Sequence, residues 1–308
     1  MSDVFEVLQP GVLTTIQDLG RTGWQRHGVG RAGAMDDFAL QVANLLVGNL
    51  RGEAAVELGL GGQRLRCLDD RIVAVCGADL GADIPLWKSF RVRKGDELVF
   101  KGAVRGAWAY LALAGGVDAE RILGSKSTCL RAALGRAVMK GDRLRAGAPR
   151  SSARDGRGVV PSEIPTYADR VSVRVVLGPH ESLFTDESLK AFLSSSFTVT
   201  PQSNRMGYRL AGPVLRHRGA ADVLSEGVVT GTVQVPADGQ PIVLMADRQT
   251  TGGYATIATV ISADLPALAQ ARPGATVSFR AVSVDEAQDL AVEIEKTLAT
   301  VQSGCAVQ

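Results

Sequence analysis

The sequence has few cysteines and histidines, and neither residue type forms a cluster. The cysteines are far apart and include no CxxC pair: Cys67, Cys76, Cys129 and Cys305. The histidines are equally scattered, at His27, His180 and His217. Zinc sites and catalytic triads need such ligands or partners at recognisable spacings. We therefore expect no metal in this chain, no histidine-based triad, and thiols that are buried or incidental in a reducing compartment.

The sequence also lacks a large excess of charge of one sign, and it has no long apolar runs. Lysine and arginine number 34 against 32 acidic residues, so the chain lacks the excess of basic residues typical of a nucleic-acid binder. No apolar run approaches the roughly 18 residues of a membrane span. The first residues, MSDVFEVLQPG, lack the basic and apolar regions of a secretory signal. We expect a soluble cytoplasmic protein that binds neither nucleic acid nor membrane.

Glycine, by contrast, is abundant, and the apolar runs are short and bounded by turn signals. There are 35 glycines among 308 residues, a length that favours two domains. A glycine turn followed by an apolar segment recurs at residues 94–98, 140–144 and 273–277. This pattern predicts a mainly β protein of barrel or sandwich type, with two related domains. The segment 146–169 has no periodicity, so we place the domains at residues 1–150 and 170–308.

Few helices are expected. Residues 35–47 carry Phe38, Val42, Leu45 and Leu46 on one stripe and are followed by Gly48, a favourable residue after a helix. A terminal helix is predicted from Ser283, a capping-box position, to about residue 299. A short helix is also expected within residues 182–193.

The stretch 224–254 is the first candidate site. Two apolar runs, 228–235 and 241–245, surround the turn signal Asp238-Gly239. The second run is followed by five consecutive polar residues and a double glycine: Asp247, Arg248, Gln249, Thr250, Thr251, Gly252 and Gly253. Such groups at the end of rigid strands are typical of binding sites. A polar hairpin end with a glycine turn is an equally good interpretation of this stretch alone.

The second candidate site lies near the N-terminus. Residues 28–33 match GxGxxG, but the preceding RTGWQRH is not the buried strand that a dinucleotide fingerprint requires. A glycine loop ending at Gly33 and leading to a helix N-terminus favours an anion instead. Gln17, Asp18 and Arg21 lie just upstream. Alternatively, Asp18 caps a turn and Arg21 is solvated.

Two further segments concentrate polar groups. In LGSKST, residues 123–128, the spacing excludes a Walker A motif, but Lys126, Ser127 and Thr128 after a glycine suit phosphate or carboxylate. A plain polar loop is slightly favoured there. Residues 203–209 contain Asn204, Arg205 and Arg209, and arginine pairs bidentately with acidic ligands. A basic hairpin tip would have the same composition.

Several blocks in consistent order resemble one family. They are QDLGRTGWQRHGVGRAGAMDDFAL, LLVGN, GGVD, LGSKST, SNRMGYRL, SEGVVTGTVQVP and GQPIVLMADRQTTGGY. Together they resemble the 5-oxoprolinase C-subunit family, whose members are also described as KipA, allophanate-hydrolase subunit 2 or biotin-dependent carboxyltransferase-like proteins. The resemblance covers roughly residues 4–284, and Ala32 stands where the family commonly has serine.

This resemblance implies two cyclophilin-like β-barrel domains in a polypeptide that works with partners. The partners are a KipI-like B subunit of 5-oxoprolinase and a LamB/YcsF-type A subunit, and the complex opens 5-oxo-L-proline to L-glutamate with ATP. Two alternatives remain. One is the carboxyltransferase module of a biotin-dependent, urea carboxylase-like enzyme, with biotin on another protein. The other is a regulatory KipI-binding protein without catalysis.

The reaction implied by this resemblance suggests roles for the candidate residues, as hypotheses from their side-chain chemistry. Asp18 or Asp247 would move the lactam proton, with Arg248 as the third catalytic candidate, and Gly33 and Lys126 would contact the nucleotide. The substrate-binding candidates are amide, hydroxyl and guanidinium side chains: Gln17, Arg21, Ser127, Thr128, Asn204, Arg205, Arg209, Gln234, Gln249 and Thr250.

Overall fold

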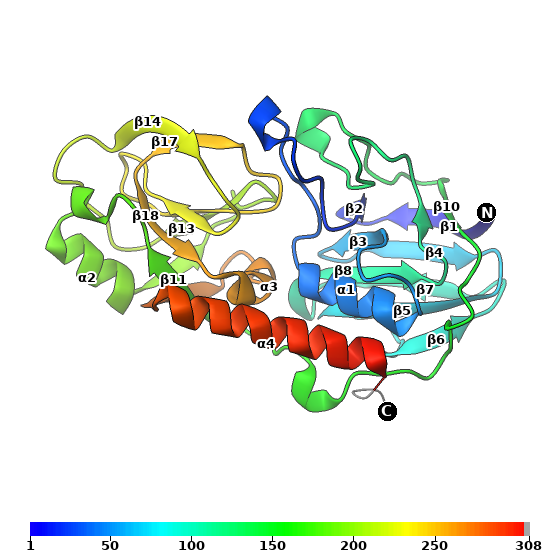
Figure 1. The fold of residues 1–308 in the computed structure, drawn as a ribbon. Coiled ribbons are helices and arrows are strands. Elements are labelled where there is room, and N and C mark those ends of the chain that lie inside the picture. Colours follow the sequence, from blue (N-terminus) through cyan, green and yellow to red (C-terminus); the bar gives the residue numbers. More distant parts are fainter. Residues whose placement is uncertain (305–308) are drawn as a thin grey trace. The chain divides into compact units, whose positions relative to one another are not determined.

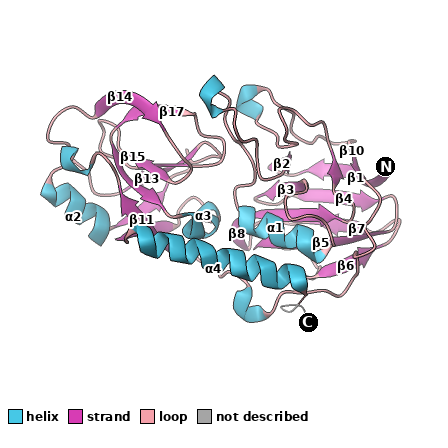
Figure 2. Ribbon diagram, viewed as in Figure 1, coloured by secondary structure: helices cyan, strands magenta, loops and turns pink. Residues whose placement is uncertain are grey.

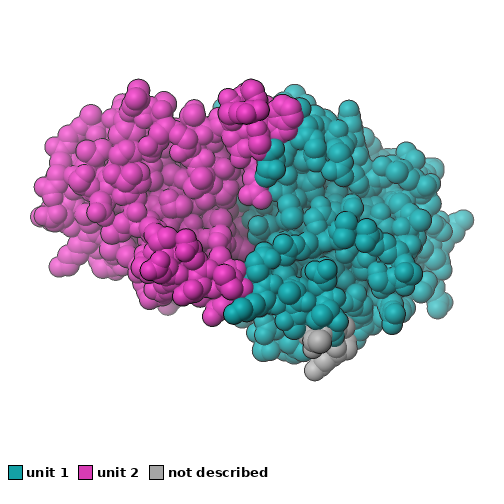
Figure 3. All heavy atoms as spheres, in the orientation of Figure 1, with its two compact units in different colours: residues 1–22, 32–166, 295–308 teal, residues 23–31, 167–294 magenta. Residues whose placement is uncertain are grey.

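The computed structural model describes residues 1–304, which form two compact units (Figure 3). Unit 1 comprises residues 1–22, 32–166 and those from 295 onward; unit 2 comprises residues 23–31 and 167–294. Most regular elements are strands (Figure 2), so the prediction of a mainly β chain with few helices is confirmed. The domain bounds 1–150 and 170–308 stay a prediction.

Unit 1 consists of two five-stranded antiparallel sheets. The first has the order β7 (Glu97–Val99), β4 (Gln63–Cys67), β1 (Ser2–Pro10), β10 (Arg143–Ala146) and β9 (Val117–Asp118). The second has the order β2 (Leu13–Gln17), β3 (Ala55–Gly59), β8 (Arg105–Leu113), β5 (Arg71–Asp79) and β6 (Ser89–Val92). Apolar side chains of both sheets, such as Phe5, Leu65, Val56 and Leu111, belong to one buried core.

Helix α1 (Asp37–Leu46) packs on β5 and β8 of the second sheet (Figure 1). It lies within the predicted range 35–47. Its N-cap Asp36 accepts a hydrogen bond from the Ala39 N–H at 2.9 Å, as an N-cap side chain should. Because α1 covers the face of the sheet opposite the core, all residues of β8 after Arg105 are buried.

Unit 2 contains a closed seven-stranded barrel. Its strand order is β11 (Arg170–Leu177), β18 (Thr256–Val260), β15 (Thr232–Gln234), β16 (Ile242–Leu244), β13 (Gly207–Ala211), β12 (Ser196–Val199) and β19 (Thr276–Ala281). β11 and β19 pair in parallel and close the barrel, which removes the exposed strand edges that open sheets carry. A separate two-stranded sheet pairs β14 (Asp222–Gly227) with β17 (Thr251–Tyr254).

The predicted turn signals lead into strands in both units. Gly95, Gly141 and Gly274 all have positive φ angles, at 97°, 88° and 92°, just before β7, β10 and β19. The predicted hairpin around Gly239 is also confirmed, because β15 and β16 are paired. The first apolar run, however, becomes strand only from Thr232.

The remaining helices are α2 (Asp186–Ser194), α3 (Leu265–Ala269) and α4 (Val284–Ser303). Short 3-10 turns occupy Gln25–His27, Leu130–Ala132, Pro161–Glu163, Glu181–Leu183 and Ser262–Asp264. The Ser283 hydroxyl accepts from the Glu286 N–H at 3.1 Å, which confirms the predicted start of α4. The sequence analysis missed α3, and α4 extends past the expected end at residue 299.

Cys67, Cys76 and Cys129 are buried thiols, as expected, and Cys305 lies outside the described residues. Within residues 1–304, no group of three His, Cys, Asp or Glu side chains is arranged to hold a metal ion. No helix of the same range combines the length and apolar character needed to span a membrane.

Candidate functional site

The carboxylate of Asp18, directly after β2, is the centre of a hydrogen-bonded cluster in unit 1. Its Oδ1 accepts from the hydroxyls of Ser125 at 2.6 Å and Ser127 at 2.5 Å, and from the Gly20 N–H at 2.8 Å. Its Oδ2 accepts from the Lys126 N–H at 2.7 Å. Asp18 is only 7% exposed, so it holds the loop 125–127 by buried, charge-assisted bonds.

Two opposing effects act on the pKa of Asp18. Burial raises it, while the hydrogen bonds from Ser125, Ser127, Lys126 and Gly20 lower it, and the net result is a lowered pKa. Asp18 is therefore ionised at neutral pH. The capping role considered for Asp18 is present, through Gly20, but it is only one of four contacts.

Gln17 and Arg21 donate hydrogen bonds to two neighbouring backbone carbonyls at the end of the same loop. Gln17 Nε2 donates to the Thr128 carbonyl at 3.0 Å, and Arg21 Nη2 donates to the Ser127 carbonyl. Gln17 is fully buried and Arg21 is 1% exposed, so the solvated alternative for Arg21 is wrong. Gln17 Oε1 and Arg21 Nη1 are buried without a hydrogen-bond partner in the described chain. One acceptor and one donor therefore remain available beside the loop.

Gly33 and Lys126, the two residues expected to contact a nucleotide, both have structural contacts. Gly33 has a φ of 97°, and a Cβ added there would lie 3.0 Å from the Gly20 nitrogen. Lys126 Nζ donates to the Val117 carbonyl at 2.8 Å and lies 3.8 Å from the Glu53 carboxylate. Their role toward a nucleotide stays a prediction.

A cavity of about 560 Å³ in unit 1 is lined in part by residues of this loop. Ile122, Lys126 and Thr128 contribute to its wall, together with apolar side chains such as Val117 and Leu144. The Arg136–Asp142 pair at its lining is closed by two hydrogen bonds, of 2.6 and 2.9 Å. Asp18 itself does not line this cavity.

In unit 2, Arg205 and Asp247 form a buried bidentate ion pair. Arg205 Nε and Nη2 each donate to one oxygen of Asp247 at 2.9 Å, and the two side chains are 8% and 9% exposed. The Asp247 N–H also donates to the Arg205 carbonyl at 2.8 Å. Residues 42 positions apart in the sequence thus converge here, and both Asp247 oxygens are engaged by a cation.

Arg248, the next residue, is buried without a carboxylate. It is 6% exposed, its Nε donates to the Val228 carbonyl at 3.3 Å, and its Nη1 donates to the Thr230 hydroxyl at 2.7 Å. Burial and, secondarily, the positive charge of Arg31 lower its pKa to about 10. Arg31 belongs to the segment 23–31 of unit 2, and a Cβ on Gly30 would lie 3.2 Å from the Arg248 carbonyl.

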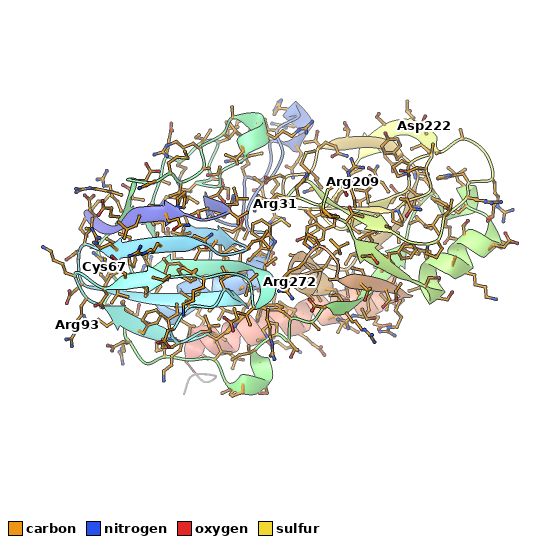
Figure 4. All side chains as sticks on the ribbon, turned by 180° about the vertical axis from the view of Figure 1, so that it is seen from behind. Arg31, Cys67, Arg93, Arg209, Asp222 and Arg272 are labelled. Carbon is orange, nitrogen blue, oxygen red and sulfur yellow. The ribbon has the colours of Figure 1, made fainter. Side chains whose placement is uncertain are left out.

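The other predicted residues of unit 2 lie in varied surroundings. Asn204, Arg209 and Gln249 are exposed, and Figure 4 labels Arg209, a residue of β13. Gln234 is 2% exposed and donates to the Tyr254 carbonyl at 3.3 Å. Thr250 accepts the Val228 N–H through its backbone. The structure therefore brings Arg205, Asp247 and Arg248 together in a buried group, whereas Asn204, Arg209 and Gln249 are exposed.

Three residues of these clusters were missed by the sequence analysis: Ser125, Thr230 and Arg31. Ser125 and Arg31 lie inside motifs that had been noticed, LGSKST and GxGxxG, but were not selected as site residues. Thr230 is a hydroxyl-bearing residue within an apolar run, and this contrast is the sequence signal that could have indicated a polar contact there.

The sequence and the fold match a known class of protein. Residues 27–281 match the family model described as "Carboxyltransferase domain, subdomain A and B", and the chain belongs to that family. The chain is 39% identical over 293 residues to the 5-oxoprolinase C subunit of Escherichia coli (strain K12), covering 92% of this chain and 93% of that protein. The C subunit of Haemophilus influenzae is 39% identical over 297 residues, with 93% and 94% covered.

Among solved structures, that of the K. lactis urea amidolyase superposes with a TM-score of 0.90 at 28% identity. The match covers 97% of this chain but only 20% of the urea amidolyase chain. The family resemblance drawn from the sequence motifs is confirmed by these matches.

Proposed function

We propose that this chain is the C subunit of an ATP-dependent 5-oxoprolinase, which opens the lactam of 5-oxo-L-proline to L-glutamate. The observation that carries the proposal is the similarity to the Escherichia coli C subunit of 5-oxoprolinase, at 39% identity across more than nine tenths of both chains. A KipI-like protein and a LamB/YcsF-type protein are the proposed partners. ATP use by the complex and a cytoplasmic location are further parts of the proposal.

The reaction needs groups that move a proton and cations that hold negative charge. Amide resonance protects the lactam carbonyl, so the ring nitrogen must lose its proton or the oxygen must be activated before water attacks. In this proposal Asp18 or Asp247 moves the proton, Gln17 and Arg21 contact the ring amide or its carboxylate, and Arg248 holds an anion. Gln17 and Arg21 each offer one unsatisfied buried polar atom for such a contact.

Both carboxylates are already engaged by hydrogen-bond donors of their own unit. Asp18 accepts four hydrogen bonds, and both oxygens of Asp247 accept from Arg205. The donors around Asp18 lower its pKa and so weaken its affinity for a proton, and the Asp247 oxygens are both occupied by Arg205. A complete proton relay therefore needs groups from a partner protein, which supports a chain that acts only within a complex.

A biotin-dependent carboxyltransferase is the second candidate function. The family description and the TM-score of 0.90 to the K. lactis urea amidolyase favour it. In that case biotin would arrive on a separate protein. Carboxylation of an acceptor from carboxybiotin, in the presence of this chain alone, would distinguish this candidate from the first.

The proposed function is tested by measuring glutamate release from 5-oxo-L-proline and ATP. The purified chain, the KipI-like partner and the LamB/YcsF-type partner are assayed singly, in pairs and together. We expect turnover only with all three, because the chain lacks a complete nucleotide-binding motif and a self-contained proton relay. Robust glutamate production by this chain alone, or an unchanged rate when it is omitted, would refute the proposal.

A further inference from the structure

Arg248 differs from Arg205, the other buried arginine of unit 2, in having no acidic partner among residues 1–304. Arg205 is neutralised by Asp247, and Arg174 is paired with Asp264 through both Nε and Nη2. In the described part of the chain, the Arg248 guanidinium donates to one carbonyl and one hydroxyl. A guanidinium removed from water without a counter-ion is unfavourable, so proteins rarely retain one without use.

The positive charge of Arg31 adds to the unfavourable free energy of the buried, charged Arg248 side chain. The field of Arg31 acts on Arg248, and it adds to burial in lowering the Arg248 pKa to about 10. Arg31, labelled in Figure 4, ends the segment 23–31, whose Gly30 packs against the backbone of Arg248. An anion bound to Arg248 would offset both the burial of its guanidinium and this repulsion.

The guanidinium of Arg248 is oriented and still has donors available. Thr230 fixes Nη1 and the Val228 carbonyl fixes Nε, while Nη2 donates to no residue in the described part of the chain. A Cβ on Gly30 would make a tight contact with the Arg248 carbonyl, at 3.2 Å, so the backbone at Gly30 lies close to that of Arg248. A fixed fork with unused N–H groups matches the oxygens of a carboxylate or phosphate.

We infer that Arg248, with Thr230 as the positioning residue, binds one oxyanion of the reaction. This inference rests on the proposed function, which supplies two sources for that oxyanion. One is the carboxylate of 5-oxo-L-proline, and the other is a phosphoryl group from ATP. Both present paired oxygens to the arginine fork, and binding experiments with separate probes distinguish them.

The test uses the purified chain and isothermal titration calorimetry with three probes. These are 5-oxo-L-proline, 2-pyrrolidinone (the same lactam without the carboxylate) and inorganic phosphate. We expect 5-oxo-L-proline or phosphate to bind, and Arg248→Ala to weaken that binding at least about tenfold. Arg248→Lys should restore the binding only in part, because lysine keeps the charge and loses the fork.

Thr230→Val should weaken the anion binding several-fold while the chain remains folded. Arg216 is an exposed arginine of the same unit, and Arg216→Ala should not change the binding.

Each outcome either identifies the oxyanion that Arg248 binds or contradicts the inference. Binding of 5-oxo-L-proline but not 2-pyrrolidinone identifies the carboxylate, and binding of phosphate identifies the phosphoryl group. If neither anion binds, or if binding is the same in the Arg248 and Thr230 variants as in the unmodified chain, the inference is wrong. Arg248-dependent binding with no glutamate release by the full complex would refute the proposed function and leave the anion site standing.

Discussion

At the scale of single residues, three of the buried charges in the candidate sites are stabilised in three different ways. Asp18 is surrounded by neutral donors, Asp247 is paired with Arg205, and Arg248 has only neutral oxygens around it. The first two are satisfied within their own unit. Of the three, Arg248 alone has neither an opposite charge nor a set of charge-stabilising partners within residues 1–304, and this is the property expected of an anion-binding residue.

Asp18→Asn tests whether the carboxylate charge holds its loop. The folded-state pKa of Asp18 lies below its ordinary value, so its stabilising effect is present above about pH 4 and is lost as pH falls through the folded pKa. We expect the variant to lose about 1.5–3 kcal/mol of unfolding free energy at pH 7. The difference should shrink at pH 3. Urea unfolding at both pH values measures it.

Asp83→Asn is the matched control, because Asp83 is exposed in the same unit. It should leave the urea midpoint unchanged at both pH values. An Asp18→Asn chain as stable as the unmodified one at pH 7 would contradict the role of Asp18 as the charged centre of the cluster.

Residue types were easier to foresee from the sequence than their partners. Gln17, Asp18 and Arg21 were selected because amide, carboxylate and guanidinium lie close together in the chain. The bonds from Ser125 and Ser127 to Asp18 join residues more than 100 positions apart, and no local pattern encodes such a pairing. Burial of Arg248 was equally unforeseeable, since a polar run after a strand is usually exposed.

At the scale of elements, regular segments followed their local patterns and interrupted ones did not. Helix α1 and the β15–β16 hairpin lie where the apolar spacing and the turn signals placed them. The run 228–235 fails as one strand because Gly231, with a φ of 89°, breaks it, and its N–H bonds to Leu244 instead. The interruption leaves Val228 and Thr230 outside the barrel strand, where both contact Arg248.

Gly33→Ala tests the close packing between the segment after β2 and the start of α1. Gly33 and Gly95 share a φ of 97°, so alanine is strained at either position by about 1–2 kcal/mol. Only at Gly33 does the new Cβ also meet backbone, 3.0 Å from Gly20, while Gly95 has open space around it. We expect Gly33→Ala to lower the melting temperature clearly more than Gly95→Ala. If both variants lower the melting temperature equally, the close packing of Gly33 on Gly20 does not contribute to stability.

At the scale of the whole molecule, the sequence indicated two β-rich halves but not the membership of every segment. Recurrent glycine turns predicted strands in both halves, because a turn and its strand are neighbours in the chain. Residues 23–31 belong to unit 2 although the segments on either side belong to unit 1. That assignment depends on packing between segments distant in sequence, for which a single sequence has no local signal. Arg31 was missed for the same reason.

The central claim is that this chain supplies an essential anion-binding arginine to a 5-oxoprolinase complex. The most direct measurement is kcat/KM for glutamate release from 5-oxo-L-proline and ATP by the reconstituted complex containing Arg248→Ala, with Arg216→Ala as the control. Size-exclusion chromatography should first show that both variants assemble normally. We predict a tenfold to hundredfold loss for Arg248→Ala, about 1.4–2.8 kcal/mol of transition-state stabilisation, and no change for Arg216→Ala. An assembled Arg248→Ala complex with the kcat/KM of the unmodified complex would contradict the account.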